Sequence, residues 1–523
     1  ANVALLEARA GRVEASVKHF REAEAELRRG GRDGEALAVA LQRALVESPD
    51  PSTYREIYAR SPDPGTRAVA ALNLGGLVVA ADPAEALALV AEARRLSSSR
   101  DVAWRADFLE GKVAMQTGRR DDAIALLGRA IDVLERTRRA LDTADQQGFR
   151  LRHAAAYELL LDAQLGAGDT RGAAAVAERM ALADLGAPPV PEGVAAPLRA
   201  AEDRLAWLDR ELAGATDERA AALRLQVGRA EADFAERVDE LRLSTPHFAE
   251  LVRTDPEDLE AVRRELPEGV VVLQPVVLPD RLVLLVYRRE RLVARDVPVG
   301  GNQLNATVMA LSNSLRRAET WDPARTASQC QSLGTWLWAP IAQEVASAHT
   351  VVISATGLLR YLPFALLRHG GRWLVEAAAV ANVTHVGSLR MGLGGFRAQG
   401  AGTLLVGNPD GSLPGAESET QAIARLLPGA TLLVRDAGTR GAVLGACEGK
   451  SLVHLATHGV LDPEVPDRSY IVLSGYPNLA GRLGYREIPA LGPFIDRARL
   501  VVLSACESGL PVDRPGTDGA PRL

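Results

Sequence analysis

Two short apolar segments of the sequence each end in a side chain that can take part in nucleophilic catalysis. Residues 451–459 have the sequence SLVHLATHG and contain His458, and residues 500–509 have the sequence LVVLSACESG and contain Cys506. Apolar runs followed by small residues predict buried strands and the turns that leave them. Since parallel strands carry their chemistry at their carboxyl ends, two such neighbours would bring an imidazole and a thiol to one edge of a sheet. A thiol beside an imidazole base is the arrangement of a cysteine nucleophile.

Each of these residues also has a purely structural interpretation. Free cysteine is among the most buried residue types, so Cys506 could belong to the core, but Ser508 and Gly509 predict a tight turn that keeps the thiol at the rim. His454 and His458 are four residues apart, a spacing that on a helix could hold zinc. Their neighbours predict a strand, on which the two rings do not converge on one ion. We therefore expect no metal and no cofactor, a packed His454, and His458 as the general base.

The composition limits which binding partners and which cellular compartment we expect for the protein. The 523 residues suffice for roughly three domains, and 61 basic against 67 acidic residues give a net charge of −6, so nucleic acid is not an expected direct partner. The three cysteines form no C-x-x-C pair, and we interpret Cys330 and Cys447 as structural. No apolar run approaches the ~20 residues of a membrane span, and no signal peptide is visible. These features predict a cytoplasmic protein without a membrane partner.

Residues 1–185 repeat a pattern in which a turn precedes a helix. Five residues after each turn, small or apolar residues recur at offsets of four and seven, which lie on one helix face. The turns are at Gly11, Ala81, Gly118 and Gly168, and the triplets are Ser16/Phe20/Ala23, Ala86/Val90/Ala93, Ala123/Leu127/Ala130 and Ala173/Ala177/Met180. The pattern resembles tetratricopeptide repeats, helix–turn–helix units of ~34 residues whose arrays bind partner proteins. The alternative is a generic alanine-rich helical bundle.

Residues 186–245 are expected to join this region to a second part of the chain. Glycine and proline at 186–193 predict a linker. Apolar residues at alternating three- and four-residue spacing at 198–212 and 220–241, with Gly214 between them, predict a long antiparallel helical hairpin. The hairpin could be a plain connector or a lever that carries a signal between the two parts.

In residues 246–523 the spacing of apolar residues changes from a helical pattern to one that includes strands. Segments at 270–273, 282–287 and 292–294 predict strands, and short apolar segments then alternate with helical stretches. Those later segments begin at Val351, Thr403, Thr431, Leu452, Tyr470 and Leu500. Alternation of strands and helices predicts an α/β domain with a mostly parallel sheet flanked by helices.

Several motifs make residues 246–523 resemble the CHAT family (caspase HetF associated with TPRs), a family of caspase-like cysteine peptidases. They are HLATHG at 454–459, LSACESG at 503–509, LRYLPFALL at 359–367, VGNP at 406–409 with LPGA at 413–416, and GYREI at 484–488. The resemblance implies a cysteine endopeptidase with His458 and Cys506 as its catalytic dyad. It also implies that backbone N–H groups of Gly459 and Cys506 hold the oxyanion.

The resemblance leaves substrate preference open. Ser504 occupies a position where some members of the clan carry an acid that favours a basic side chain at the cleavage point, so a basic preference cannot be transferred. Asp462 either orients the site, lines a substrate pocket or stabilises its own loop. We expect a protein substrate and a regulatory protein that binds the helical repeats. Bacterial defence or cell death is the implied setting.

The sequence is also compatible with two other functions, and it departs from the family pattern in one respect. The alternative function is a non-catalytic scaffold made of repeats and a caspase-like domain. A third is a cysteine acyltransferase or amidase that acts on small molecules. The chain ends 17 residues after Cys506 (523 − 506), so the resemblance predicts that the C-terminal part of the domain is missing. It could be truncated, present as a second C-terminal fragment of the same protein after processing, or omitted because it is disordered.

Overall fold

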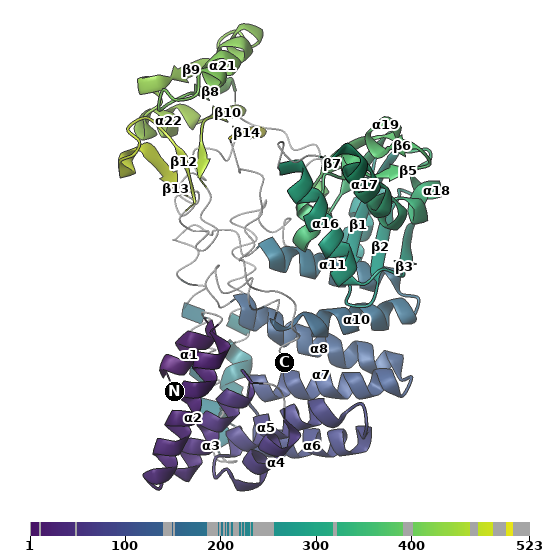
Figure 1. Cartoon of the computed structure of the whole chain (residues 1–523), viewed down its shortest axis with the longest axis vertical. Helices are drawn as coiled ribbons and strands as arrows, with labels where there is room; N and C mark the ends of the chain where they lie inside the picture. The colour runs from purple at the N-terminus through teal and green to yellow at the C-terminus, as the bar shows by residue number, and fades with distance from the viewer. Residues whose placement is uncertain are drawn as a thin grey trace.

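The computed structural model describes residues 2–9, 12–47, 50–139, 149, 152–185, 256–316, 322–390, 401–460, 469–484 and 498–505, together with scattered helical residues between 197 and 233. An all-helical arm precedes an α/β part that contains two main sheets (Figure 1). The predicted fold class, a helical solenoid-like region followed by a caspase-like α/β domain with a mostly parallel sheet, is confirmed at this level.

The arm consists of consecutive helices that pack on their sequence neighbours. They are α1 (Asn2–Arg9), α2 (Val13–Arg29), α3 (Asp33–Ala44), α4 (Pro51–Arg60), α5 (Pro64–Val78), α6 (Pro83–Leu96), α7 (Arg100–Gln116), α8 (Arg120–Arg139), α10 (Ala154–Gly166) and α11 (Thr170–Leu185). The helix faces predicted from the triplets are buried in the arm, and only Ala23 is partly exposed. Small side chains at these positions let the paired helices approach closely.

Three helices of the arm begin with the same aspartate–proline pair. Asp50, Asp63 and Asp82 are the N-cap residues of α4, α5 and α6, and each carboxylate accepts a hydrogen bond from a backbone N–H of the first turn. The proline that follows has no N–H to leave unsatisfied and already has a helical φ. The sequence therefore determines where these helices begin.

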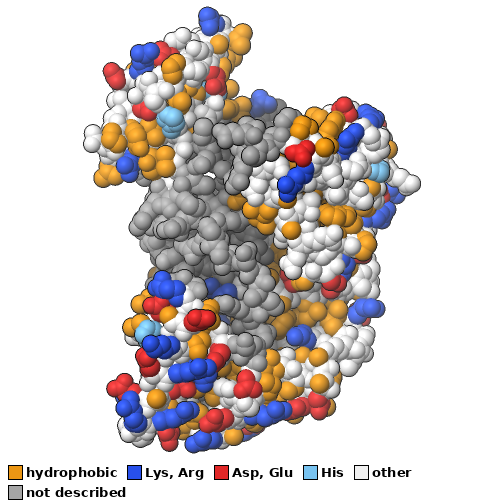
Figure 2. Space-filling view, in the orientation of Figure 1, with side chains coloured by type: hydrophobic (Ala, Val, Ile, Leu, Met, Phe, Trp, Pro, Cys, Tyr) orange, Lys and Arg blue, Asp and Glu red, His pale blue; other side chains and the backbone are white. Residues whose placement is uncertain are grey.

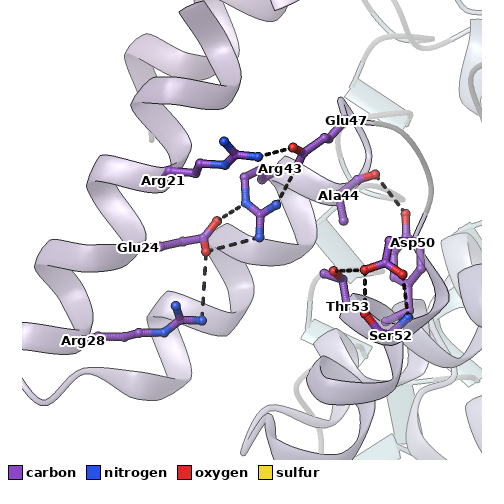
Figure 3. A network of polar contacts seen from close by, with 10 residues as sticks. Arg21, Glu24, Arg28, Arg43, Ala44, Glu47, Asp50, Ser52 and Thr53 are labelled. Carbon is purple, nitrogen blue, oxygen red and sulfur yellow. Dashed lines mark hydrogen bonds and ion pairs between the residues drawn. The ribbon is translucent and has the colours of Figure 1, made fainter. Parts of the chain in front are cut away.

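A partly buried ion pair joins α2 to α3 (Figure 3). Arg43 on α3 donates to Glu24 on α2, with 2.6 Å between Nε and Oε1, and it also donates to Glu47 one turn further along the chain. Glu24 is only 4% exposed, so its charge needs this partner. Elsewhere on the visible face of the arm, acidic and basic side chains alternate (Figure 2). Such solvated pairs contribute little to stability.

The first sheet has five strands in the order β3-β2-β1-β4-β7. They are β1 (Val270–Val277), β2 (Leu282–Tyr287), β3 (Leu292–Val297), β4 (Thr350–Ile353) and β7 (Ala379–Asn382). β1, β2 and β3 form antiparallel pairs, whereas β1, β4 and β7 run parallel. Hairpins connect the antiparallel strands, and α16 (Gly301–Arg316) and α17 (Pro323–Leu337) lie between β3 and β4 in the chain.

The two faces of this sheet belong to different cores because side chains alternate along a strand. Val272, Val276 and Tyr287 pack with residues of α8, α10, α11 and α15 (Pro256–Glu265), so one face rests on the arm. Leu273 and Leu284, on the other face, pack with residues of α16 and α17. Burial on both faces explains why β2 is apolar throughout.

The second sheet has four parallel strands in the order β14-β10-β8-β9. They are β8 (Thr403–Gly407), β9 (Thr431–Val434), β10 (Leu452–Ala456) and β14 (Leu500–Ser504). The helices α21 (Pro414–Leu426) and α22 (Arg440–Cys447) lie between these strands in the chain. Val443 and Cys447 of α22 share one core with Leu404 and Val453 of the sheet.

The structure differs from the sequence prediction in how the strands are grouped. Among the described residues, the strands predicted as one alternating series form two separate main sheets. The predicted strand at Tyr470 is β12 (Tyr470–Val472), which pairs antiparallel with β11 (Gly459–Val460) and β13 (Arg482–Gly484) in a small third sheet. Strand existence follows from local apolar runs, whereas pairing depends on contacts between distant segments.

Two further findings concern the predicted hairpin and the helices as a whole. Leu208, Leu212, Ala220 and Leu223, which lie on the predicted seam of residues 198–241, pack together in one cluster. In the part of the chain that the structure describes, none of the helices has the length and apolar character needed to cross a bilayer.

Candidate active site

The strands of the two sequence segments that suggested catalysis lie side by side. β10 and β14 are adjacent parallel strands, in a register that pairs Ala456 with Ser504. The pairing extends one residue beyond β10, because Thr457 N donates to Ser504 O at 3.2 Å. His458 follows at the carboxyl end of β10. Cys506, two residues after Ser504, and Asp462 lie outside the described residues.

Hydrogen bonds to neighbouring strands hold the backbone at His458. The buried hydroxyl of Thr457 donates to Val472 O at 2.6 Å, and Val472 N donates to His458 O at 2.9 Å. The second bond makes Gly459 and its partner Ile471 a non-hydrogen-bonded pair of the β11–β12 ladder. The Gly459 N–H is therefore directed away from β12 and does not serve that ladder.

The His458 ring is held from the side opposite β14. Its Nε2 lies 2.7 Å from Ser412 Oγ and 3.9 Å from Asp410 Oδ2. Both residues belong to the loop that connects β8 to α21, and β8 is the neighbour of β10 away from β14. The His458 side chain is 37% exposed and that of Asp410 is 12% exposed. The imidazole is thus accessible while one of its nitrogens is engaged.

Asn408 determines the shape of this loop. It has a left-handed backbone conformation with φ of 49°, and its N–H donates to Ala456 O at 3.0 Å. Its side-chain oxygen accepts from Leu413 N at 2.6 Å, and its amide nitrogen donates to Glu417 at 3.2 Å. Asparagine tolerates this φ better than most residues. Because Asn408 is completely buried, the loop around Ser412 is fixed to β10.

A second polar cluster lies beneath the same edge of the sheet. Glu419 of α21 accepts from Ser504 Oγ at 3.2 Å and lies 2.9 Å from His454 Nε2. His454 is a buried strand histidine with a partner, as the sequence predicted, and it does not share a ligand with His458. The Ser504 hydroxyl is bonded to an acid from another element. An acidic side chain therefore lies next to the position that is occupied here by serine.

The other cysteines are core residues. Cys330 on α17 and Cys447 on α22 are both buried, and burial raises the pKa of each thiol. A raised thiol pKa lowers the fraction of reactive thiolate. Both residues thus have the structural role predicted for them. Within the described ranges, no three His, Cys, Asp or Glu side chains are grouped so that they could hold a metal ion.

Sequence reasoning missed Asp410, Ser412 and Glu419. A signal for the first two was present, because VGNP at 406–409 and LPGA at 413–416 bracket the loop that contains them. Once β8 is placed beside β10, a polar loop at its carboxyl end must lie near His458. Glu419 had no such signal, since its contacts depend on how α21 packs on the sheet.

Comparison with known proteins gives a match for part of the chain. No curated protein matches it. The CHAT domain family model matches residues 328–522, a range that begins in α17 and includes β4, β7 and all four strands of the second sheet. The sequence resemblance had indicated the same family, which is one of caspase-like cysteine peptidases. The matched range contains the parallel sheet with His458 at its edge, so residues 328–522 are similar to the CHAT domain family.

Proposed function

We propose that the protein is a cysteine endopeptidase in which His458 and Cys506 form the catalytic pair. The observation that supports this most is the register of β10 and β14, which pairs Ala456 with Ser504. His458 and Cys506 each follow two residues after a member of that pair. Adjacent parallel strands in register leave the sheet at the same edge, so the two segments begin from neighbouring points.

The proposed reaction follows from these side chains. The thiol proton of Cys506 passes to the imidazole of His458, and the sulfur attacks the scissile carbonyl carbon. The N–H groups of Gly459 and Cys506 donate to the oxyanion. His458 then returns the proton to the leaving amine as the C–N bond breaks. Water hydrolyses the resulting thioester and regenerates the thiol.

We further propose that a partner protein bound to the helical arm controls this activity. The arm is attached to the first sheet by polar contacts as well as by its core, since Gln274 Nε2 on β1 donates to Glu178 on α11 at 3.2 Å. Partner binding should therefore act on the α/β part through α11. Hydrogen exchange at residues 408–412 and 457–460, with and without a partner, tests this idea. Activation without any change in protection at these loops would exclude it.

The test of the peptidase proposal uses the full chain and two single variants, Cys506→Ala and His458→Ala. The wild-type protein, incubated with candidate substrate proteins, should generate new termini that mass spectrometry identifies. Each variant should lower their formation by at least about a hundredfold, because a nucleophile and its base act as a unit. Cys447→Ala is the control, since Cys447 is buried in a core. Equal cleavage by wild type and Cys506→Ala would contradict the proposal.

The same variants separate the peptidase from the scaffold. A scaffold would keep its partner binding and its cellular effect in Cys506→Ala and His458→Ala. A peptidase would keep binding but lose its effect. The accessible His458 ring, with one nitrogen held by Ser412, favours the peptidase.

A further inference from the structure

We propose that Ser412 and Asp410 are positioning residues that select the tautomer of His458 and make Nδ1 the nitrogen that accepts a proton. This inference rests on the proposed function for its catalytic meaning. The tautomer itself is a property of the resting protein and can be measured without any turnover.

The direction of the hydrogen bonds follows from the donors available. Ser412 Oγ lies 2.8 Å from Asp410 Oδ2 and 2.7 Å from His458 Nε2. A serine hydroxyl has one proton, and a carboxylate can only accept. The hydroxyl proton is therefore donated to Asp410, and the oxygen is left to accept from the ring. His458 Nε2 must carry the proton of that bond, so Nδ1 has a free lone pair in the neutral ring.

The Asp410 carboxylate is held in place by a second bond. Its Oδ1 accepts from Ser412 N at 3.2 Å, while Oδ2 accepts from the Ser412 hydroxyl. The carboxylate is thus oriented by a backbone donor that cannot rotate. The loop itself is fixed by Asn408, which is bonded to Ala456 of β10. β10 therefore leads into His458 and also anchors the loop that orients the ring.

This arrangement also affects the charged state of the ring. When Nδ1 accepts the thiol proton, the imidazolium keeps its Nε2–H bond to Ser412 and lies 3.9 Å from the Asp410 carboxylate oxygen. A hydrogen bond from a charged donor is stronger than one from a neutral donor. The pair therefore favours the ion that forms as the sulfur becomes a thiolate.

The decisive variant is Asp410→Asn. The Ser412 N–H should keep the amide oxygen at the position of Oδ1, so the amide NH₂ faces Ser412 Oγ and donates to it. The hydroxyl proton then turns toward His458 Nε2, and the ring proton moves to Nδ1. Nitrogen-15 NMR of histidine-labelled full-length protein reports the tautomer, and the His458→Gln variant assigns the signal. We expect an Nε2–H ring in the wild type and an Nδ1–H ring in Asp410→Asn.

Reaction rates provide the second measurement. Ser412→Ala and Asp410→Asn should slow iodoacetamide alkylation of Cys506 and the turnover of any substrate by about ten- to a hundredfold, because each disturbs a hydrogen bond to a charged group. Ser412→Thr keeps the hydroxyl and should therefore react faster than Ser412→Ala. Ser418→Ala is the matched control, since its hydroxyl bonds only Pro414 O of α21 among the contacts described.

The outcomes distinguish this inference from the peptidase proposal. If His458→Ala leaves cleavage intact, the peptidase proposal fails. The nitrogen-15 NMR measurement of the His458 tautomer still tests the inference in that case. If His458→Ala abolishes cleavage while Ser412→Ala and Asp410→Asn keep wild-type rates, the inference is wrong. An Nδ1–H ring in the wild-type protein would also overturn it.

Discussion

At the scale of single residues, the surroundings of each cysteine separate structural thiols from the proposed nucleophile. Cys330 and Cys447 are buried, and burial raises the pKa of both thiols. Neither has a histidine among the contacts that the structure describes. In the sequence Cys506 comes two residues after Ser504, with which Ala456 of β10 is paired. Of the three cysteines, we therefore expect Cys506 to be the one that acts as a nucleophile.

This difference predicts selective alkylation of the native protein. Iodoacetamide at neutral pH should modify Cys506 first, with Cys330 and Cys447 more than about a hundredfold slower, because they react only after local opening. Mass spectrometry of peptides taken over time gives the three rates. In urea all three should react at similar rates. Faster native modification of Cys447 than of Cys506 would refute the prediction.

Glu419 is expected to stabilise the edge of the second sheet. It lies within hydrogen-bond distance of both the buried His454 and the Ser504 hydroxyl. Glu419→Ala would leave the buried imidazole without this acceptor, at a cost of about 1–3 kcal/mol. Denaturant midpoints should show the loss, whereas Gln421→Ala, an exposed change on the same helix, should have almost no effect. Equal midpoints for the two variants would argue against the role given to Glu419.

At the scale of elements, close helix packing in the arm depends on glycine. A Cβ added at Gly111 of α7 would lie 2.7 Å from Leu127 Cγ on α8, and Leu127 is completely buried. Gly128, on α8 itself, has open space where its Cβ would stand. Neither glycine has a positive φ. The two positions therefore separate the effect of packing from the effect of helix propensity.

We predict opposite effects of alanine at these glycines. Gly111→Ala should destabilise the arm by about 1–3 kcal/mol because the core of α7 and α8 becomes overpacked. Gly128→Ala should stabilise it by about 0.5–1 kcal/mol, since alanine favours the helix. Thermal unfolding followed by circular dichroism measures both. A gain in stability at Gly111 would show that α7 and α8 can separate without cost.

At the scale of the whole molecule, a buried carboxyl group joins the arm to the α/β part. Glu178 on α11 is completely buried and accepts from Gly387 N at 2.6 Å, Val386 N at 3.1 Å and Gln274 Nε2 at 3.2 Å. Burial raises its pKa to about 7, against the opposing effect of these donors. Val386 and Gly387 follow β7, so one side chain links the arm to β1 and to the turn after β7.

The raised pKa of Glu178 predicts a stability that depends on pH. The folded state holds this proton up to about pH 7, whereas an unfolded glutamate loses it near pH 4.3. The folded protein therefore binds more protons in this range, and stability falls as pH rises through it, by up to about 3–4 kcal/mol from this group.

A neutral variant isolates that contribution. Glu178→Gln should lose less stability between pH 5 and pH 8 than the wild type, as measured by denaturant midpoints. Glu14→Gln, an exposed change on α2, should follow the wild type. An identical pH dependence in Glu178→Gln would mean that the carboxyl is not protonated in the folded protein at pH 5.

The sequence by itself determined the elements and the residues at their ends. Aspartate–proline pairs define helix starts, small residues at offsets of four and seven define the buried helix faces, and apolar runs define β8, β9, β10 and β14. These features depend on neighbours in the chain, so periodicity and local chemistry suffice to find them. The same local signals identified His458 and Cys506 as candidate catalytic residues.

Only the tertiary structure decided which elements meet. The separation into two main sheets, the pairing of Tyr470–Val472 with β11 and β13, and the contacts of Glu419 join segments far apart in the sequence. The loop from β8 places Ser412 against His458, 46 residues away along the chain. Such contacts depend on strand order and helix packing, and no single segment contains that information.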